Sequence, residues 1–201
     1  MKQQTTMENK QDILKRLASP DVQTVSGAIE ELRENGDISI VPELLEILLH
    51  SNEPAIVTPV TSWLSDVKDS NFKTVLIEKL INAPAQSNKA NLLRICWESA
   101  IDFSEFLEIF TDILIEEDFI NALEASTVIE NLNGNIADEK IEVAIRRLST
   151  ECKGDKKFLA EDAIAYLEEL LVRKQEEEKE LAKQAEHRHQ HEEDCGCHHH
   201  D

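Results

Sequence analysis

Residues 36–49, GDISIVPELLEILL, contain the pattern that decides the fold of this chain. A Gly-Asp pair and a proline precede leucines at positions 44, 45, 48 and 49, which recur at intervals of three and four residues. This spacing places apolar side chains along one side of an α-helix. The segment therefore predicts a turn that leads into an amphipathic helix with one buried face.

The same periodicity extends in both directions through most of the sequence. Short groups of Ser, Asp, Asn, Gly and Pro interrupt it, and these residue types cap helix starts or permit the left-handed residue that ends a helix. Because the connecting segments are short, consecutive helices are expected to form antiparallel pairs. The expected pairs are 9–18 with 21–34, 38–50 with 53–68, 71–82 with 87–101, 104–115 with 118–132, and 136–150 with 156–173.

The expected pairs repeat along the chain. The second helices begin at a mean spacing of about 34 residues, which is typical of helical repeats. A single pair cannot cover its own apolar face, so neighbouring pairs must stack. Like residues 34 positions apart support one repeated environment: Trp63 and Trp97, Phe72 and Phe106, and Leu80 and Leu114.

Two short segments carry a family resemblance. In residues 36–48 a Gly-Asp turn precedes an apolar-Pro-x-Leu helix start, and residues 19–22 read Ser-Pro-Asp-Val ahead of Ala28 and Leu32. These features resemble a HEAT repeat over residues 19–50; the match is weaker over 51–115 and is mainly periodicity over 116–172. The resemblance implies an all-α fold, a right-handed α-solenoid of about five antiparallel helix pairs, which serves as a binding surface and has no activity of its own. Such a fold does not by itself name a function.

The charge of the chain restricts its partners. The net charge is −20, and residues 1–172 contain 32 acidic and 16 basic residues. An acidic body repels the phosphates of nucleic acid and anionic membrane surfaces, so neither is expected as a partner. The charge favours another protein with a basic surface. The oligomeric state does not follow from the sequence.

The sequence offers few signs of catalysis or of export. It contains no phosphate-binding glycine loop, no GxSxG and no HExxH, so we expect no enzymatic activity. No signal peptide or membrane-spanning run is found, and a cytoplasmic location is expected. Cys96 and Cys152 are then free thiols, Cys96 within the core and Cys152 near a helix end where it is open to solvent. Trp63 and Tyr166 are assigned to the core, and Pro59 marks a bend or the true start of a helix capped by Thr58.

The chain is expected to have four parts: a disordered amino terminus over 1–8, the helical repeat domain over 9–172, a charged helical extension over 173–186 and a flexible tail over 187–201. Pairs of opposite charge such as Glu176 and Lys179 support a solvated helix in the extension. A partner helix for a coiled coil is the alternative for this segment.

The tail is rich in nitrogen and sulfur donors. Six of the seven histidines and two of the four cysteines lie in 187–201. If the helix continues, His187 and His191 stand one turn apart, whereas Cys195 and Cys197 flank a flexible glycine. Such donors suit Zn²⁺, Ni²⁺, Co²⁺ or Cu⁺. The predicted ligands are His187, His189, His191, Cys195, Cys197, His198, His199 and His200.

Two functional hypotheses follow. The first is a non-enzymatic scaffold or adaptor for protein–protein interaction, to which the tail adds accessory metal binding. The alternative is a metallochaperone or a metal buffer or sensor, in which the tail carries the function. Opportunistic metal binding without a biological role, or a purification tag, are further explanations of the tail composition.

Overall fold

The computed structural model describes residues 2–19, 21–35, 38–69, 71–84 and 87–194. Side chains are described within residues 10–184, with 20, 22, 35–37, 70, 85 and 86 excepted. The predicted all-α class is confirmed for this part of the chain, which contains helices and no strand. None of its helices combines the length and the apolar composition needed to cross a bilayer.

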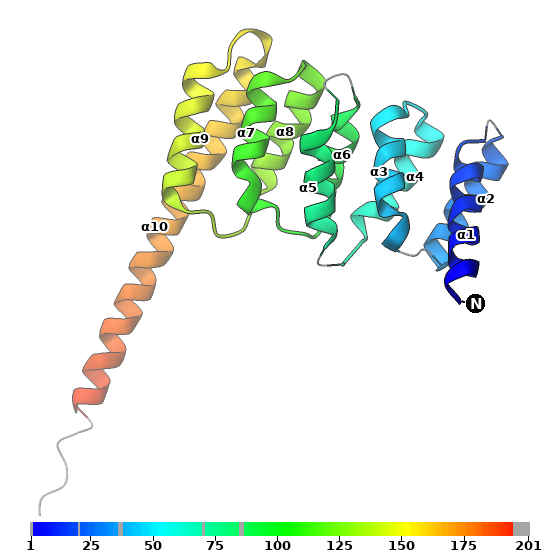
Figure 1. The fold of residues 1–201 in the computed structure, drawn as a ribbon. Helices are drawn as coiled ribbons and strands as arrows, with labels where there is room; N and C mark the ends of the chain where they lie inside the picture. The colour runs from blue at the N-terminus through cyan, green and yellow to red at the C-terminus, as the bar shows by residue number, and fades with distance from the viewer. Residues whose placement is uncertain (1, 20, 36–37, 70, 85–86, 195–201) are drawn as a thin grey trace, which may run out of the picture.

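Ten α-helices lie in the described part of the chain (Figure 1). Three short 3₁₀ turns, Ile38–Ile40, Ser104–Phe106 and Gly154–Lys156, lead into α3, α7 and α10. The α-helices are α1 Lys2–Leu17, α2 Val22–Asn35, α3 Val41–His50, α4 Pro54–Ser65, α5 Phe72–Asn82, α6 Lys89–Glu98, α7 Leu107–Glu116, α8 Phe119–Asn131, α9 Asp138–Glu151 and α10 Lys157–Asp194.

The helices follow one another in a row from α1 at one end to α10 at the other (Figure 1). Contacts join α1 to α2, α3 to α4, α5 to α6, α7 to α8 and α9 to α10. The even-numbered helices also contact one another in order, α2 with α4, α4 with α6, α6 with α8 and α8 with α10, and odd-numbered contacts join α3 to α5 and α7 to α9. The apolar face of each helix pair is therefore covered by the neighbouring pairs.

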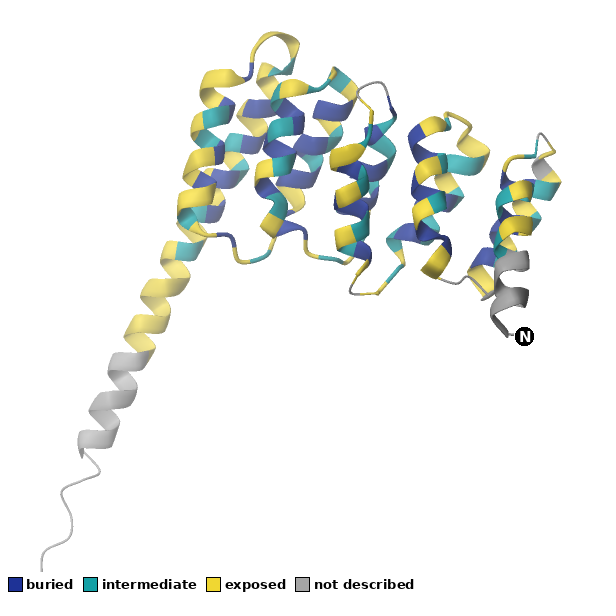
Figure 2. Cartoon of the chain, viewed as in Figure 1, coloured by how far each residue is buried: buried dark blue, intermediate teal, exposed yellow. Residues whose placement is uncertain are grey.

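One apolar cluster extends through the row, from Ile13 in α1 to Leu170 in α10. The four leucines of the opening sequence segment lie in it, and Leu44, Leu45 and Leu48 are fully buried. Figure 2 shows the buried positions on the inner sides of the helices and the exposed positions on the outside. Burial of apolar area, at roughly 25 cal/mol per Å², is the main force that holds the helices together.

Ion pairs connect successive odd-numbered helices. Lys10 of α1 lies 2.9 Å from Glu43 of α3, and Asp112 of α7 lies 2.5 Å from Arg147 of α9. Between these, Glu46 of α3 pairs with Lys79 of α5, and Lys73 of α5 pairs with Glu105 in the turn before α7. Hydrogen bonds from Lys79 and then His50 lower the pKa of the Glu46 carboxyl. Each junction of the odd-numbered helices thus contains one such pair.

The helix bounds agree closely with the predicted ranges, except at the two ends of the chain. Helix α1 begins at Lys2, within the segment 1–8 that was expected to be disordered. Helix α10 continues through the predicted extension 173–186 and into the predicted flexible tail, as far as Asp194. Charged residues with high helix propensity support a helix without packing against the body.

Some predictions for single residues need correction. Helix α4 begins with Pro54 at its first position and contains Pro59 in its interior, so Pro59 does not mark the helix start. Cys152 is buried, because the 3₁₀ turn that follows it covers the thiol, and its Sγ donates to the Lys156 carbonyl at 3.7 Å. Trp63 and Tyr166 pack against the core but are only partly buried.

The prediction for Cys96 is confirmed, since it lies in the core at 5% exposure. Burial raises the pKa of the Cys96 thiol, because the thiolate loses its hydration there. Its Sγ donates to the Leu92 carbonyl one turn earlier, at 3.5 Å. The group is a small apolar side chain of α6 and not a reactive thiol.

Candidate functional site

A groove of about 260 Å³ lies between α7 and α9. It is lined by the exposed Val143, the buried Ala144 and the buried Thr111. The Thr111 hydroxyl donates to the Leu107 carbonyl at 2.8 Å and is therefore occupied within its own helix. Charged side chains, Glu108, Glu139, Lys140 and Arg147, complete the lining.

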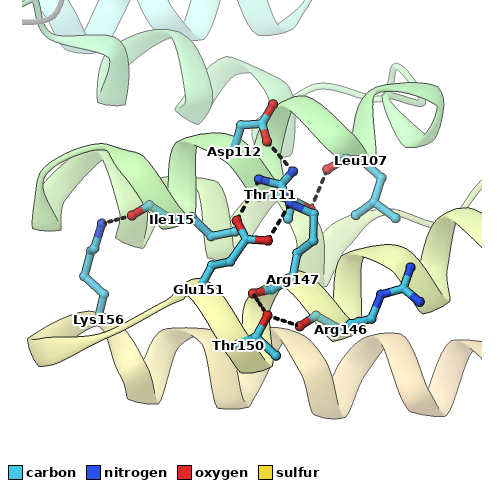
Figure 3. A network of polar contacts seen from close by, with 9 residues as sticks. All are labelled: Leu107, Thr111, Asp112, Ile115, Arg146, Arg147, Thr150, Glu151 and Lys156. Atoms are coloured by element: carbon cyan, nitrogen blue, oxygen red, sulfur yellow. Dashed lines mark hydrogen bonds and ion pairs between the residues drawn. The ribbon is translucent and has the colours of Figure 1, made fainter.

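Arg147 lines the groove and ties α9 to α7 (Figure 3). Its guanidinium bonds both carboxylate oxygens of Glu151 at 3.2 Å and Asp112 at 2.5 Å. The hydrogen bonds that Arg147 donates to Glu151 and Asp112 raise the pKa of its guanidinium above the usual value. The guanidinium stays charged and engaged, which leaves the Glu108 and Glu139 carboxylates and the Lys140 ammonium as the charged groups open to a ligand.

The size of the groove limits what it can bind. Sites for drug-sized molecules and cofactors have volumes of roughly 300–1,000 Å³. A groove of about 260 Å³ with a mostly apolar lining has room for a side chain or a short chain segment.

A second hollow, of about 390 Å³, lies where α10 leaves the body. It is bounded by the turn 133–135 on one side and by α10 from Leu170 to Leu181 on the other. Arg173, Lys174, Glu177 and Glu178 give it both signs of charge. The turn is held in place because Gly134 N–H donates to Ser104 Oγ at 2.8 Å.

An apolar surface lies at the first turns of α8 and α10. Phe119 and Phe158 face each other with ring centroids 6.1 Å apart. Phe158 is 51% exposed, and Ile120 and Leu123 of α8 are 58% and 39% exposed. We refer to these four residues as the α8–α10 apolar surface. Single exposed apolar residues are ordinary on proteins, whereas a group of large ones is typical of a binding surface.

This surface was missed by the sequence analysis. The helical stripe predicts which residues of α8 are buried, and Ala122, Ala125, Val128 and Ile129 follow it. Ile120 and Leu123 fall outside that stripe. Large apolar residues on the solvent-facing side of an amphipathic helix depart from its pattern, so the sequence did contain a signal for this surface. The pairing of Phe119 with Phe158, 39 positions away, depends on the packing of α8 against α10.

The predicted metal ligands are not brought together by any contact that the structure describes. His187, His189 and His191 belong to the helical backbone of α10, which places 187 and 191 one turn apart, but their side chains lie outside the described residues. Cys195, Cys197, His198, His199 and His200 lie outside them entirely. Among the side chains that are described, no three of His, Cys, Asp or Glu gather to form a metal site.

Comparison with protein-family models, with curated proteins and with solved structures finds no match to this chain.

Proposed function

We propose that this chain is a non-enzymatic scaffold for protein–protein interaction, built as a right-handed α-solenoid of antiparallel, HEAT-like helix pairs. The tail adds an accessory site for Zn²⁺, Ni²⁺, Co²⁺ or Cu⁺. The row of helices carries this proposal. Each helix pair packs against the next along the chain, and one apolar cluster runs through all of them. Such a row leaves two long outer surfaces for partners.

Charge supports a basic partner. Several bases of the body are already paired with acids, as in Lys10–Glu43, Lys89–Glu117 and Arg94–Glu124. Residues 1–172 contain twice as many acidic as basic residues, so acidic groups remain in excess on the outside. A basic surface on the partner is attracted to such a body and associates faster at low ionic strength.

The alternative, a metallochaperone or metal buffer in which the tail carries the function, has its own support. Helix α10 continues as a single helix past the body to Asp194 (Figure 1). At about 1.5 Å per residue, the segment beyond Val172 holds the start of the donor-rich tail roughly 20 Å from the body. A tail at that distance is accessible to a second protein or to free ions.

The two functions are separated by deletion of residues 187–201. A partner is first captured with the full chain and purified. We expect this partner to bind the form without residues 187–201 with unchanged affinity. The affinity should fall as salt is raised, because the attraction is electrostatic. Calorimetric titration with zinc, nickel and reduced copper should show binding by the full chain only. Partner binding that requires both the tail and bound metal would instead establish the alternative.

A further inference from the structure

We propose that the α8–α10 apolar surface binds a basic amphipathic helix of a protein partner. The proposal rests on the scaffold function above and assigns that function a surface and a class of ligand. It is carried by the exposed apolar side chains, by their spacing and by the charges around them.

The spacing of the surface suits a helix. Phe119 and Leu123 are four positions apart on α8, and Ile120 lies three positions before Leu123. Phe158, from the first turn of α10, extends the apolar area across the junction of the two helices. An amphipathic helix presents apolar anchors at the same three- and four-residue intervals and binds such surfaces through them.

Exposed acidic residues flank the members of this surface along the chain. Asp118 caps the first turn of α8, where its carboxylate accepts from Asn121 N–H at 3.0 Å. Glu116 ends α7 two residues before Asp118. Asp155 and Asp162 lie within one turn of Phe158, on either side of it. All four are exposed, so their charges are open to a partner.

Three of the four lysines nearby contact other groups. Lys89 is buried and pairs with Glu117, whereas Lys156 donates to the carbonyls of Ile115 at 2.6 Å and of Glu117 at 2.7 Å. Lys157 lies 3.5 Å from Glu161, and Lys153 is exposed. The acidic residues 116, 117, 118, 155, 161 and 162 outnumber the lysines 89, 153, 156 and 157 by six to four, so the net charge around the surface is negative and a lysine- or arginine-rich segment complements it.

A second copy of this chain is a poorer occupant. The exposed part of α10 beyond Val172 is the long free helix of the chain, but over 173–184 Leu181 is its one large apolar residue and glutamate its commonest one. A helix of this composition lacks a row of anchors, and its four glutamates are balanced by four basic residues, so it offers no net positive charge to the surface.

The test uses the full chain and three fluorescent peptides in an anisotropy titration. The first peptide contains leucine and lysine, with leucine at helical spacing. The second replaces each lysine by glutamate. The third has the composition of the first with leucine and lysine in strict alternation, which favours a strand over a helix. We expect the first peptide to bind and the other two to bind at least about tenfold more weakly.

Two double variants locate the binding. Ile120→Ser with Leu123→Ser should weaken the first peptide by about tenfold or more, because it removes two anchors. Ile81→Ser with Val172→Ser removes two side chains that are 57% and 53% exposed elsewhere, and should leave the affinity unchanged. Ile120→Lys, at the most exposed position of the surface, provides a second measurement and should also weaken binding.

The proposal would be overturned if the first double variant bound the first peptide as tightly as the unchanged chain, or if both double variants lost the same affinity. Preference of the chain for the glutamate peptide would also overturn it. The proposal would also be overturned if the chain self-associates and the first double variant abolishes that self-association. The surface would then bind a second copy of the chain. These results do not decide the scaffold function. That function is tested separately, by the binding of the purified partner to the form without residues 187–201, and the partner could bind there at another surface.

Discussion

Lys174 of α10 donates a hydrogen bond of 2.5 Å to the main-chain carbonyl of Ile136, in the turn before α9. The same ammonium pairs with Asp138, in the first turn of α9. Ile136 is buried at 2% exposure, whereas α10 beyond this point is exposed to solvent. This lysine thus anchors the projecting helix to the body at the place where it leaves.

Replacement of this lysine should destabilise the body. We expect Lys174→Met to lower the free energy of unfolding by about 1 kcal/mol, because a nearly buried carbonyl loses its donor. Lys179→Met, at an exposed position farther along the same helix, should change it by less than about 0.5 kcal/mol. Urea denaturation of both variants provides the measurement. Equal effects would show that Lys174 contributes no more than a surface charge.

The ion pair between Asp112 and Arg147 should couple α7 to α9. In a double-mutant cycle with Asp112→Ala and Arg147→Ala, we expect a coupling energy of about 0.5–1 kcal/mol, since both side chains are partly exposed. The coupling should decrease in high salt because the pair is partly screened. A cycle in which the two losses simply add would mean that the contact contributes nothing.

Much of the fold could be predicted because it depends on local sequence. The leucines of residues 44–49 define their buried face by spacing alone, and the paired helices follow from short polar turns. The extent of α10 could not be predicted in this way. Its last turns have no packing partner, so no apolar pattern marks where the helix ends.

The contacts between neighbouring helix pairs were less predictable. Trp63 and Trp97 are 34 positions apart and suggested one repeated environment. Their indole N–H groups point in opposite directions along the row: Trp63 donates to the Leu32 carbonyl of α2 at 2.9 Å, and Trp97 donates to the Glu124 carboxylate of α8 at 2.8 Å. The partner of each depends on which neighbour offers an acceptor, and a periodic pattern carries no information about that.

The candidate binding surfaces also differ in how far the sequence could predict them. The tail was found from composition alone, because histidine and cysteine name their own chemistry. The α8–α10 apolar surface needs Phe119 and Phe158 to meet across two helices, and the groove between α7 and α9 needs Val143 beside Thr111. Both depend on tertiary packing.

Gly134 should not tolerate a side chain. A Cβ at this position would lie 2.0 Å from Asp102 Oδ2 and 2.6 Å from its Cγ. Asp102 can move aside only by giving up the hydrogen bond that its Oδ1 accepts from Ser104 N–H at 2.9 Å, and the Ser104 hydroxyl in turn holds Gly134. We expect Gly134→Ala to lower the melting temperature by several degrees, from a loss of about 1–3 kcal/mol.

Gly27→Ala is the matched control for this substitution. Its Cβ would lie 3.2 Å from Arg16 Nη2, the far end of a flexible side chain, and alanine is favoured over glycine inside a helix by about 1 kcal/mol. A neutral or raised melting temperature is expected there. A similar loss in both variants would assign the effect to backbone flexibility and not to the contact with Asp102.

The buried thiol of Cys96 should make stability depend on alkaline pH. Burial raises the pKa of this thiol in the folded chain, whereas the unfolded chain releases the proton near pH 8.5. The contribution to stability is therefore complete below about pH 8.5 and is lost as the pH rises above it, at up to about 1.4 kcal/mol per pH unit. Other groups titrate in this range, so the difference between the wild type and Cys96→Ala isolates the thiol. Denaturation at a series of pH values should show the wild type losing stability faster than Cys96→Ala, and parallel curves would place the thiol in contact with water.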